Sequence, residues 1–340
     1  MASFDPSSPA AGLSPEPSAS ASATASASAD PAELTVIIVS YKTRDLTLKC
    51  LQTLYANTAR TRMRVVVYDN ASDDGTVEAI RAQYPQVELI ASPQNLGFAA
   101  ANNWVAERAG TEWLVLLNPD TEVHENGIDN LLDFARAHPQ AGLTGGRTYF
   151  PDGTLNPLSC QGRITPWSSL SRALGLTAVF RTSAFFNPEA YGDWPRDTAR
   201  EVDIIVGCLL MIRKELWDEL GGFDLRYYMY GEDSDLALRA RRLGYRPMIC
   251  PDATIMHLVG ASSTVKARKT VMVATSRVTL IRHHWPDWQV PVGVFLMWLW
   301  GALRVAAAKA MALRGGEKAR TRAATWTHVW SKRHDWLKGY

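Results

Sequence analysis

The stretch from Leu34 to Asp69 decides the fold: LTVIIVSYKTRDLTLKCLQTLYANTARTRMRVVVYD. It opens with a run of apolar, mostly β-branched residues that lacks the alternation of a half-exposed strand, which is typical of a strand buried on both faces. In the middle, Leu48, Leu51 and Tyr55 are spaced to lie on one face of a helix. The stretch ends in a second apolar run, VVVYD, which predicts a second strand.

The same alternation of strands and helices continues to about residue 135. Its further members are a helix with Val77, Ile80 and Tyr84 on one face, a strand Val87–Ile90, a loop leading into an Ala-rich helix, a strand Trp113–Leu117, and a helix with Ile128, Leu131, Leu132 and Ala135 on one face. Helices of this length between strands favour one mostly parallel central sheet with helices on both faces. We therefore expect an α/β fold.

The composition is that of a globular protein with an uneven distribution of charge. The chain has 340 residues, 46% of them hydrophobic, which is enough for a sizeable core. Its net charge of +2 indicates no nucleic-acid partner. Residues 301–340 contain nine Lys or Arg and two Asp or Glu, a charge of +7, so the rest of the chain carries −5. The four cysteines lack CxxC spacing and indicate neither a zinc site nor a disulfide framework.

Three regions follow from the composition. Residues 1–32 are almost all Ala, Ser and Pro, so we expect them to be disordered, and they lack the basic and apolar segments of a signal peptide. Residues 33–285 are expected to form the α/β domain, with one half at 33–139 and the other at 140–285. Residues 286–340 form a basic, Trp-rich C-terminal region.

Polar side chains follow the predicted strands at the points where the strands end. They are Thr43 after the first strand, Asp69 after the second, Asn95 after the third and Asp120 after the fourth. Ligands of open α/β sheets bind beyond the carboxyl ends of the strands, so we expect these side chains to line one site. Asp69 is left free for binding because Ser72, Asp73 and Asp74 are better placed to cap the next helix. Neither GxGxxG nor a P-loop motif is present.

The chain from residue 140 to 200 is rich in Gly, Pro, Ser and Arg and less regular. Its segment GGRTYFPDGTLNP predicts a β-hairpin with Asp152–Gly153 as the turn. Beyond the hairpin we expect a long, mobile loop region over the binding cleft. A strand and a short helix follow in VDIIVGCLLMIRKELWDELGGFD, and the chain is expected to be helical again from Lys266 to Trp285.

An acidic and aromatic cluster precedes a helix that we expect to begin at about Asp233. The helix has Leu236, Ala240 and Leu243 spaced to one face and Gly244 at its C-terminal cap position. The cluster contains Glu232, Asp233 and Asp235 beside Tyr227, Tyr228 and Tyr230. Acids are favoured at a helix N-terminus by the helix dipole, which is one interpretation. The other is a general base at the mouth of a cleft.

Two residues have the chemistry of metal ligands. Asp120 follows a buried strand, with the backbone before it restricted by Pro119. A carboxylate in this position suits a hard divalent cation that substrate phosphates complete, although an ordinary turn residue is the alternative. His257 lies in an apolar segment, where a structural role is the alternative.

Together these segments resemble the family 2 glycosyltransferases, and more narrowly the rhamnosyltransferase-like branch that builds bacterial surface polysaccharides. The resemblance covers residues 34–282 and rests on the order and spacing of VIIVSYKTRDLTLKCLQTL, VVVYDNASDDGT, NLGFAAANNW, LLNPD, VGCLLMIRKELWDELGGFD, YMYGEDSDLALRARRLGYR and MHLVGASS. It implies a GT-A fold, a nucleotide-sugar donor, Mg²⁺ or Mn²⁺ as cofactor, and inversion at the anomeric carbon.

The resemblance also assigns roles to individual residues. Those that match the donor-nucleotide positions are Thr43, Asp69, Asn95, Gly97 and Asn118. Asp120 matches the last acid of the DxD motif, in which Asn118 replaces the first acid, and His257 matches the histidine that completes the metal site. Asp233 matches the catalytic base of the Glu-Asp motif. The candidates on the acceptor side of the cleft are Tyr230, Glu232 and Asp235.

The C-terminal region has the composition of a segment that lies on a membrane. Seven of the 12 Trp lie between Trp285 and Trp336, among basic residues, as in interfacial helices on anionic lipid. The apolar run from residue 290 to 303 is too short to predict a span, and a longer one would be interrupted by Arg304 and Lys309. A packed C-terminal helix is the alternative. We expect a cytoplasmic enzyme attached peripherally to the inner face of the cell membrane, where lipid-linked acceptors lie.

The donor sugar is left open by the residues. The resemblance favours L-rhamnose from dTDP-rhamnose, with UDP-galactofuranose, a UDP-hexose or a UDP-N-acetylhexosamine as alternatives, and a lipid-linked or polysaccharide acceptor. A non-catalytic sugar-nucleotide-binding protein is disfavoured because Asp120, Asp233 and His257 are all present. A nucleotidyltransferase is disfavoured because SYKTRDL, after the first strand, has no glycine.

Overall fold

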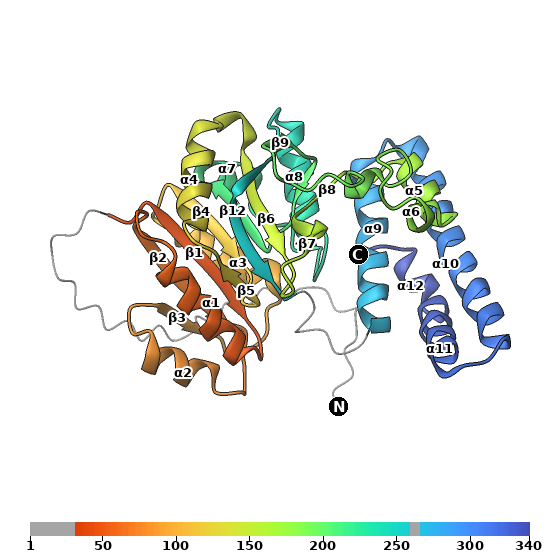
Figure 1. The fold of residues 1–340 in the computed structure, drawn as a ribbon, viewed down its shortest axis with the longest axis horizontal. Coiled ribbons are helices and arrows are strands. Elements are labelled where there is room, and N and C mark those ends of the chain that lie inside the picture. The colour runs from red at the N-terminus through yellow and green to blue at the C-terminus, as the bar shows by residue number, and fades with distance from the viewer. Residues whose placement is uncertain (1–30, 259–265) are drawn as a thin grey trace.

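The computed structural model describes residues 31–258 and 266–340, which form an α/β part with a helical part beside it (Figure 1). The segment expected to be disordered therefore lies outside the described residues, except for residues 31 and 32. Of the MHLVGASS motif, Met256, His257 and Leu258 are described.

The α/β part is built on one central sheet. Its strands are β1 (Leu34–Ser40), β2 (Met63–Asp69), β3 (Glu88–Ala91), β4 (Trp113–Leu117), β5 (Thr121–Val123), β6 (Leu143–Tyr149), β7 (Leu155–Asn156), β9 (Arg200–Glu201), β11 (Leu209–Arg213) and β12 (Met248–His257). The main order is β3-β2-β1-β4-β11-β6-β12-β5. The first four strands of this order are parallel, which confirms the predicted sheet. Among the later strands, β6 and β12 are parallel, whereas β11 and β5 run antiparallel to their neighbours.

Helices cover both faces of the sheet, as predicted. One face packs against α1 (Arg44–Ala56), α2 (Thr76–Gln83) and α4 (Gly127–Ala137), and the other against α3 (Phe98–Glu107), α7 (Lys214–Leu220) and α8 (Glu232–Arg242). Within β1, Val36 and Ile38 face the first group and Ile37 and Val39 the second, because side chains alternate along a strand. Both faces are closed by apolar side chains, so polar residues that bind a ligand are left at the carboxyl edge of the sheet.

The segment between residues 150 and 206 differs in part from the expected loop. The predicted hairpin is present as β6 and β7, closed by a hydrogen bond from Phe150 N to Thr154 O (2.8 Å). Beyond it lie η2 (Pro157–Ser159), β8 (Cys160–Gln161), α5 (Pro166–Ala173), α6 (Leu176–Val179), η3 (Pro188–Ala190) and β10 (Ile204–Ile205), and β8 pairs with β10. Helix α5 begins with a capping box of Thr165 and Ser168. Because the capping box and packing against α10 stabilise a helix here, these residues are helical instead of lying in the expected loop.

The helical part joins the C-terminal region to α9. It consists of α9 (Lys266–His284), η4 (Asp287–Gln289), α10 (Val290–Leu313), α11 (Glu317–Ser331) and α12 (Arg333–Trp336), with α5 and α6 packed beside them (Figure 1). Its buried core contains Ala274, Val278, Ile281, Met297 and Trp336. Helix α9, which we expected in the α/β domain, thus packs largely against the helices that follow residue 286.

Helix α10 is longer than the apolar run from which it was predicted. It has 24 residues, and the helical stretch Asp287–Leu313 is long and apolar enough by length and composition to cross a membrane. Only 28% of the apolar part of this helix is buried, whereas an equally long and apolar core helix of a soluble protein is mostly buried. Arg304 and the alanines after it continue the same helix, so its length is that of the longer alternative considered from the sequence, and whether it spans or lies on a membrane stays open.

Two smaller predictions differ from the structure. Strand β3 begins at Glu88 instead of Val87, because the Val87 amide bonds to Tyr84 O in the preceding turn (3.0 Å). Helix α8 begins one residue before Asp233, and Leu243 is 51% exposed instead of lying on its buried face. That face is formed by Leu236, Ala237 and Ala240, and Gly244 follows the helix with φ +100° as its capping position requires.

Candidate active site

Asp69 ends β2 with an unused acceptor. It is 1% exposed, its Oδ1 accepts a hydrogen bond from Ser72 N (2.9 Å), and its buried Oδ2 has no partner among the described residues. Burial raises the pKa of this carboxyl. Of the predicted caps, Asp74 bonds to the start of α2 through Thr76 N (3.2 Å). Because buried polar atoms are nearly always paired, Oδ2 suits a ligand that donates a hydrogen bond.

Thr43 lies directly before α1 at the same edge of the sheet. Its hydroxyl belongs to a buried network with Ser40 Oγ (3.2 Å) and Thr47 Oγ1 (3.3 Å). The structure therefore gives this hydroxyl protein partners, and a contact with the donor stays a prediction.

The loop before α3 contains Asn95 and Gly97. The Asn95 side-chain oxygen accepts a hydrogen bond from Gly97 N (2.8 Å). Asn70, the residue after β2, holds the loop, because it accepts from Leu96 N (3.0 Å) and donates to Gly97 O (3.2 Å). Gly97 has φ +83°, and a Cβ there would lie 3.3 Å from Tyr228 O. The loop thus reaches the aromatic cluster before α8. Sequence reasoning missed Asn70, although its place directly after β2 was a usable signal.

Asp120, three residues after β4, and His257, the last residue of β12, lie side by side. His257 Nε2 is 3.3 Å from Asp120 Oδ1, and each residue is 9% exposed. Burial works against the charged imidazole, but hydrogen bonds with Asp120 and with Cys208 outweigh it and raise the pKa of His257 to about 10. His257 Nδ1 is buried without a hydrogen-bond partner among the described residues. A carboxylate beside an imidazole fits a divalent cation, which on binding would displace the proton that the raised pKa keeps on the ring.

Gly207 and Cys208 connect this pair to the acids of α8. Gly207 N donates to Asp233 Oδ2 (3.1 Å), and Cys208 O accepts from Asn118 N (3.1 Å). The Cys208 side chain contacts His257. Two consecutive residues thus hold the predicted base and the predicted metal ligands in one site. Their role was not visible in the sequence, because two of the three contacts use backbone groups, which every residue carries.

Glu232 and Asp233 form a carboxyl pair at the start of α8. Asp233 Oδ1 accepts from Ser234 N (2.6 Å), and Glu232 is 7% exposed with its Oε2 unpaired among the described residues. Burial, reinforced by Asp233, raises the pKa of Glu232 to about 8, and burial also raises the pKa of Asp233. Neighbouring buried carboxyls with raised pKa values are suited to general base catalysis near neutral pH.

Residues from the helical part contact the cluster before α8, which was predicted to lie on the acceptor side. Lys269 Nζ lies 5.6 Å from the ring centre of Tyr230, and the Tyr340 hydroxyl donates to Met229 O (3.2 Å). Burial, with Glu232 nearby, raises the pKa of Tyr340 to about 12. Sequence reasoning missed Lys269 and Tyr340, because no local pattern brings them to a cluster so far away in the chain.

Asp235 does not lie free on the acceptor side as predicted. Its side chain is buried, with Oδ2 bound by Arg239 Nε (2.7 Å) and Oδ1 by His284 Nε2 (2.8 Å). Its neighbour Arg239 is one helical turn further along α8, so the ion pair is an ordinary i, i+4 contact. Asp235 therefore joins α8 to α9.

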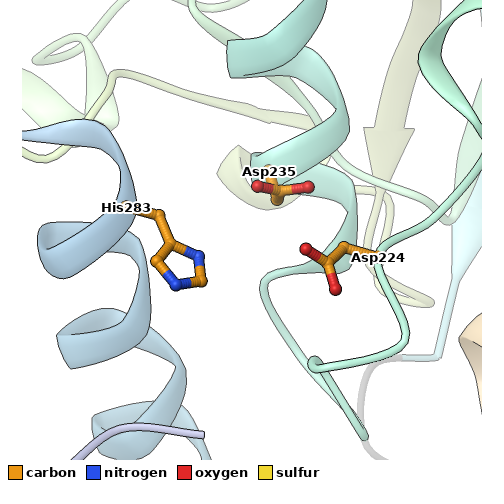
Figure 2. Close-up of side chains that lie close together, drawn as sticks. All are labelled: Asp224, Asp235 and His283. Atoms are coloured by element: carbon orange, nitrogen blue, oxygen red, sulfur yellow. The ribbon is translucent and has the colours of Figure 1, made fainter.

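A second group of potential metal ligands lies beside Asp235. Figure 2 shows His283 of α9 facing Asp235 and Asp224, and their ligand atoms lie within 4.8 Å of one another. That spacing suits a metal ion, but arginine side chains of the protein already bind this group. Arg226 lies 2.6 Å from Asp224 and 2.7 Å from His283 Nε2, and Arg239 binds Asp235. The group therefore acts as an ion-pair network between α8 and α9.

A cavity of about 510 Å³ lies beside β5, β12 and the β6–β7 hairpin. Among the residues that line it, Glu122 and Met256 are paired across β5 and β12. Side chains alternate along strands, so these two point away from the face that carries Thr121 and His257. The cavity therefore lies apart from the Asp120–His257 pair.

The site has three parts at one edge of a GT-A-type sheet. They are an unsatisfied carboxylate at the end of β2, a carboxylate–histidine pair beyond β4 and β12, and a carboxyl pair at the start of α8. Such a sheet with these parts defines a glycosyltransferase that uses an activated sugar.

Comparisons with known proteins agree with this class. The profile described as Glycosyl transferase family 2 matches residues 35–190, and the one described as N-terminal domain of galactosyltransferase matches residues 197–283. The N-acetylglucosaminyl-diphospho-decaprenol L-rhamnosyltransferase of Mycobacterium tuberculosis is 33% identical to this chain. The similarity covers 66% of this chain and 75% of that enzyme. The O-antigen biosynthesis protein RfbC of Myxococcus xanthus is 27% identical, over 68% of this chain and 18% of its own.

A solved structure shows the same fold. The mannosyltransferase PcManGT from Pyrobaculum calidifontis, in complex with GDP-Man and Mn²⁺, matches with a TM-score of 0.55 at 21% identity, over 89% of this chain and 87% of that chain. The chain belongs to glycosyl transferase family 2 and is a glycosyltransferase.

Proposed function

We propose that this glycosyltransferase inverts the anomeric carbon and moves L-rhamnose from dTDP-rhamnose to a lipid-linked acceptor in the synthesis of a cell-surface glycan. The observation that carries the proposal is the Gly207–Cys208 bridge, which holds Asp233 and the Asp120–His257 pair in one site. The rhamnosyltransferase of Mycobacterium tuberculosis supports the choice of sugar and of a prenyl diphosphate acceptor.

In the proposed reaction, Asp233 acts as the general base. It takes the proton of an acceptor hydroxyl while that oxygen attacks the anomeric carbon and the bond from this carbon to the donor diphosphate breaks. Asp69, through its free Oδ2, and the loop of Asn95 and Gly97 hold the nucleotide. The base and the leaving group lie on opposite sides of the sugar, which produces inversion.

Asp120 and His257 are the proposed ligands for Mg²⁺ or Mn²⁺. The bound ion would neutralise the charge on the departing diphosphate. The unpaired His257 Nδ1 and the adjoining carboxylate support this assignment.

The enzyme is proposed to work at the cytoplasmic face of the cell membrane as a peripheral protein. Helix α10 exposes Val292, Phe295 and Trp298, and α11 carries exposed basic residues such as Arg320 and Arg322. An apolar face flanked by basic side chains favours a position in the interface of an anionic bilayer.

A donor screen tests the proposed sugar. The purified protein is incubated with dTDP-rhamnose, UDP-hexoses, UDP-N-acetylhexosamines or UDP-galactofuranose and a prenyl-diphosphate-linked sugar as acceptor, and the released nucleoside diphosphate is measured. We expect turnover with dTDP-rhamnose at least tenfold above every other donor. Preference for a UDP-sugar would replace rhamnose, and no turnover with any of these donors would contradict the proposal.

Removal of the metal tests the Asp120–His257 pair. We expect EDTA to stop transfer, and Asp120→Ala to abolish both transfer and Mn²⁺ binding measured calorimetrically in the presence of dTDP. Asp224→Ala, in the other group of potential ligands, is the matched control and should leave Mn²⁺ binding unchanged. Full activity in EDTA would show that transfer needs no metal, and loss of Mn²⁺ binding in the control alone would assign the metal to the group of Asp224.

A further inference from the structure

A cavity of about 290 Å³ lies where the C-terminal ends of α8 and α9 meet the segment before α5. Four arginines line it: Arg163, Arg241, Arg242 and Arg246. Leu238 and Trp285 form its apolar wall. None of these residues belongs to the three parts of the candidate active site, so the cavity needs a separate explanation.

The cavity has more positive charge than the surrounding acids can neutralise. Among the described residues, Asp203 is the acid that forms an ion pair with one of these arginines. Its carboxylate lies 3.1 Å from Arg241 Nη2. His284 also lines the cavity, but its Nε2 is bound to Asp235. Four guanidiniums against one carboxylate leave an excess of about three positive charges, which favours an anion.

Helix capping explains only part of this arrangement. Arg242 Nη2 donates to His283 O (2.8 Å), and Arg246 Nη1 donates to Gly244 O and Tyr245 O (both 3.1 Å). Basic residues at helix C-termini are favoured by the helix dipole. Each guanidinium has five N–H donors, however, and these bonds use one nitrogen of each. The remaining donors of Arg242 and Arg246 can bind a ligand.

The chemistry of the lining indicates a phosphate with an apolar group attached. Planar guanidiniums bind phosphate oxygens in pairs. Leu238 and Trp285 would cover the carbon atoms next to the phosphate. A phosphodiester that carries a glycerol or a chain matches both kinds of lining, whereas a bare anion would leave the apolar wall without a partner.

The neighbouring surface indicates where such a phosphodiester comes from. Trp288, three residues after the cavity-lining Trp285, is 76% exposed. Helix α10 begins two residues later and exposes Val292 (48%) and Phe295 (55%). A basic cavity beside exposed aromatic and apolar side chains is the arrangement of an interfacial lipid contact.

We propose that this cavity binds the phosphate of an anionic membrane phospholipid, with Arg242 and Arg246 as the main contacts, and so orients the enzyme on the bilayer. The proposal rests on the proposed membrane attachment, but it is independent of the sugar that the enzyme transfers. It places the specific lipid contact at the ends of α8 and α9 instead of in the basic tail.

Binding to vesicles tests the proposal with the full chain. Arg242→Ala/Arg246→Ala is compared with Arg320→Ala/Arg322→Ala, which removes the same charge from exposed positions of α11. The vesicles contain phosphatidylcholine alone or with phosphatidylglycerol. One basic residue near an anionic surface contributes about fivefold, so the tail variant should lose up to about 25-fold on phosphatidylglycerol. We expect the cavity variant to lose at least tenfold more than the tail variant. Equal losses, or no loss in the cavity variant, would overturn the proposal.

Further measurements remove the alternative explanations. A thermal unfolding curve shows whether the cavity variant folds, and Arg242→Lys/Arg246→Lys, which keeps the charge but not the paired geometry, should also bind more weakly than the wild type. If the lysine variant binds vesicles as tightly as the wild type, charge alone is sufficient for binding, which would contradict the proposed phosphate site. Inorganic phosphate at millimolar concentration should not displace the wild type, and displacement would identify free phosphate as the ligand. Transfer of the sugar to a short soluble acceptor should be unchanged in the cavity variant. If the wild type does not transfer to this acceptor, the result contradicts the proposed function and not the lipid site.

Discussion

At the scale of single residues, the acids at the start of α8 give two candidate bases where the resemblance indicated one. Asp233 accepts hydrogen bonds from Gly207 and Ser234, whereas Glu232 has an unpaired buried oxygen among the described residues. Hydrogen bonds stabilise the ionised carboxylate, so Asp233 is the member of the pair that is more readily ionised. This is why we assign the base to Asp233.

Substitution of the two acids separates their roles. Asp233→Asn keeps the shape but removes the basic oxygen, so turnover should fall by about 10²–10⁴-fold while the dissociation constant of the donor stays near normal. Glu232→Gln is the matched control and should reduce turnover less. Because burial raises the pKa of Asp233, wild-type turnover should increase with pH up to that raised value. A larger loss in Glu232→Gln would move the base to Glu232.

The raised pKa of Glu232 also predicts how stability depends on pH. The pKa rises from 4.5 to about 8 on folding, so between these values the folded protein keeps a proton that the unfolded chain has released. Stability of the wild type therefore falls as pH increases across this window. Glu232→Gln carries no such proton, so its free energy of unfolding relative to the wild type should increase from pH 4.5 to 8 and then level off. Urea denaturation at several pH values measures this, with the exposed Glu219→Gln as a control that should show no trend.

At the scale of elements, α8 is placed by the glycine before it. Gly231 has φ +94°, and a Cβ there would lie 2.0 Å from Ser276 Oγ of α9. The first turn of α8 therefore lies directly against α9, which brings the acids close to the helical part. A side chain at this position would collide with the Ser276 hydroxyl and crowd the Tyr227 ring.

Two glycines at the ends of α8 make a matched pair of variants. Gly244 has φ +100° but open space around its Cβ position, so Gly244→Ala should cost about 1–2 kcal/mol from backbone strain alone. Gly231→Ala should cost about 1–3 kcal/mol more, because the new methyl group meets Ser276. The free energies of unfolding from urea denaturation compare the two. Equal costs would mean that α9 moves aside without penalty.

At the scale of the whole molecule, the helical part contacts the candidate active site and carries the proposed membrane surface. Helix α9 contributes Lys269 to the acceptor side, while Ala274 and Ile281 pack in the core with Met297 of α10. Deletion of the chain from residue 290 would expose that core. Membrane attachment is therefore better tested by substitutions on the outer face of α10.

The exposed face of α10 supplies such a test. Val292 and Phe295 are 48% and 55% exposed, so Val292→Ser/Phe295→Ser should leave the core intact. A fully buried apolar side chain contributes about 1.5–3 kcal/mol, so loss of two half-exposed ones should weaken vesicle binding by at least about tenfold. Sedimentation with vesicles measures this, and Leu158→Ser, at a position 45% exposed in the α/β part, is the control. Unchanged binding in the α10 variant would exclude this face as the membrane contact.

The sequence by itself determined the first four strands, the helices between and after them, and the polar residues at the ends of these strands. Apolar runs and helical spacing reflect burial, which is a local property of each segment, so β1, β2 and β4 were predicted with their bounds nearly correct. Asp69, Asp120, His257 and Asp233 were predicted as site residues because their chemistry and order are visible in the sequence.

The tertiary structure alone decided which of these residues lie close together and which other residues connect them. Gly207 N and Cys208 O bind Asp233 and Asn118 through backbone groups, which no side-chain pattern reveals. Lys269 and Tyr340 come from elements distant in the chain, and Asp235, although placed like its neighbours in sequence, turns to Arg239 and His284. Contacts between distant segments depend on how whole faces pack, and packing is settled by the summed burial of many residues instead of by any one stretch.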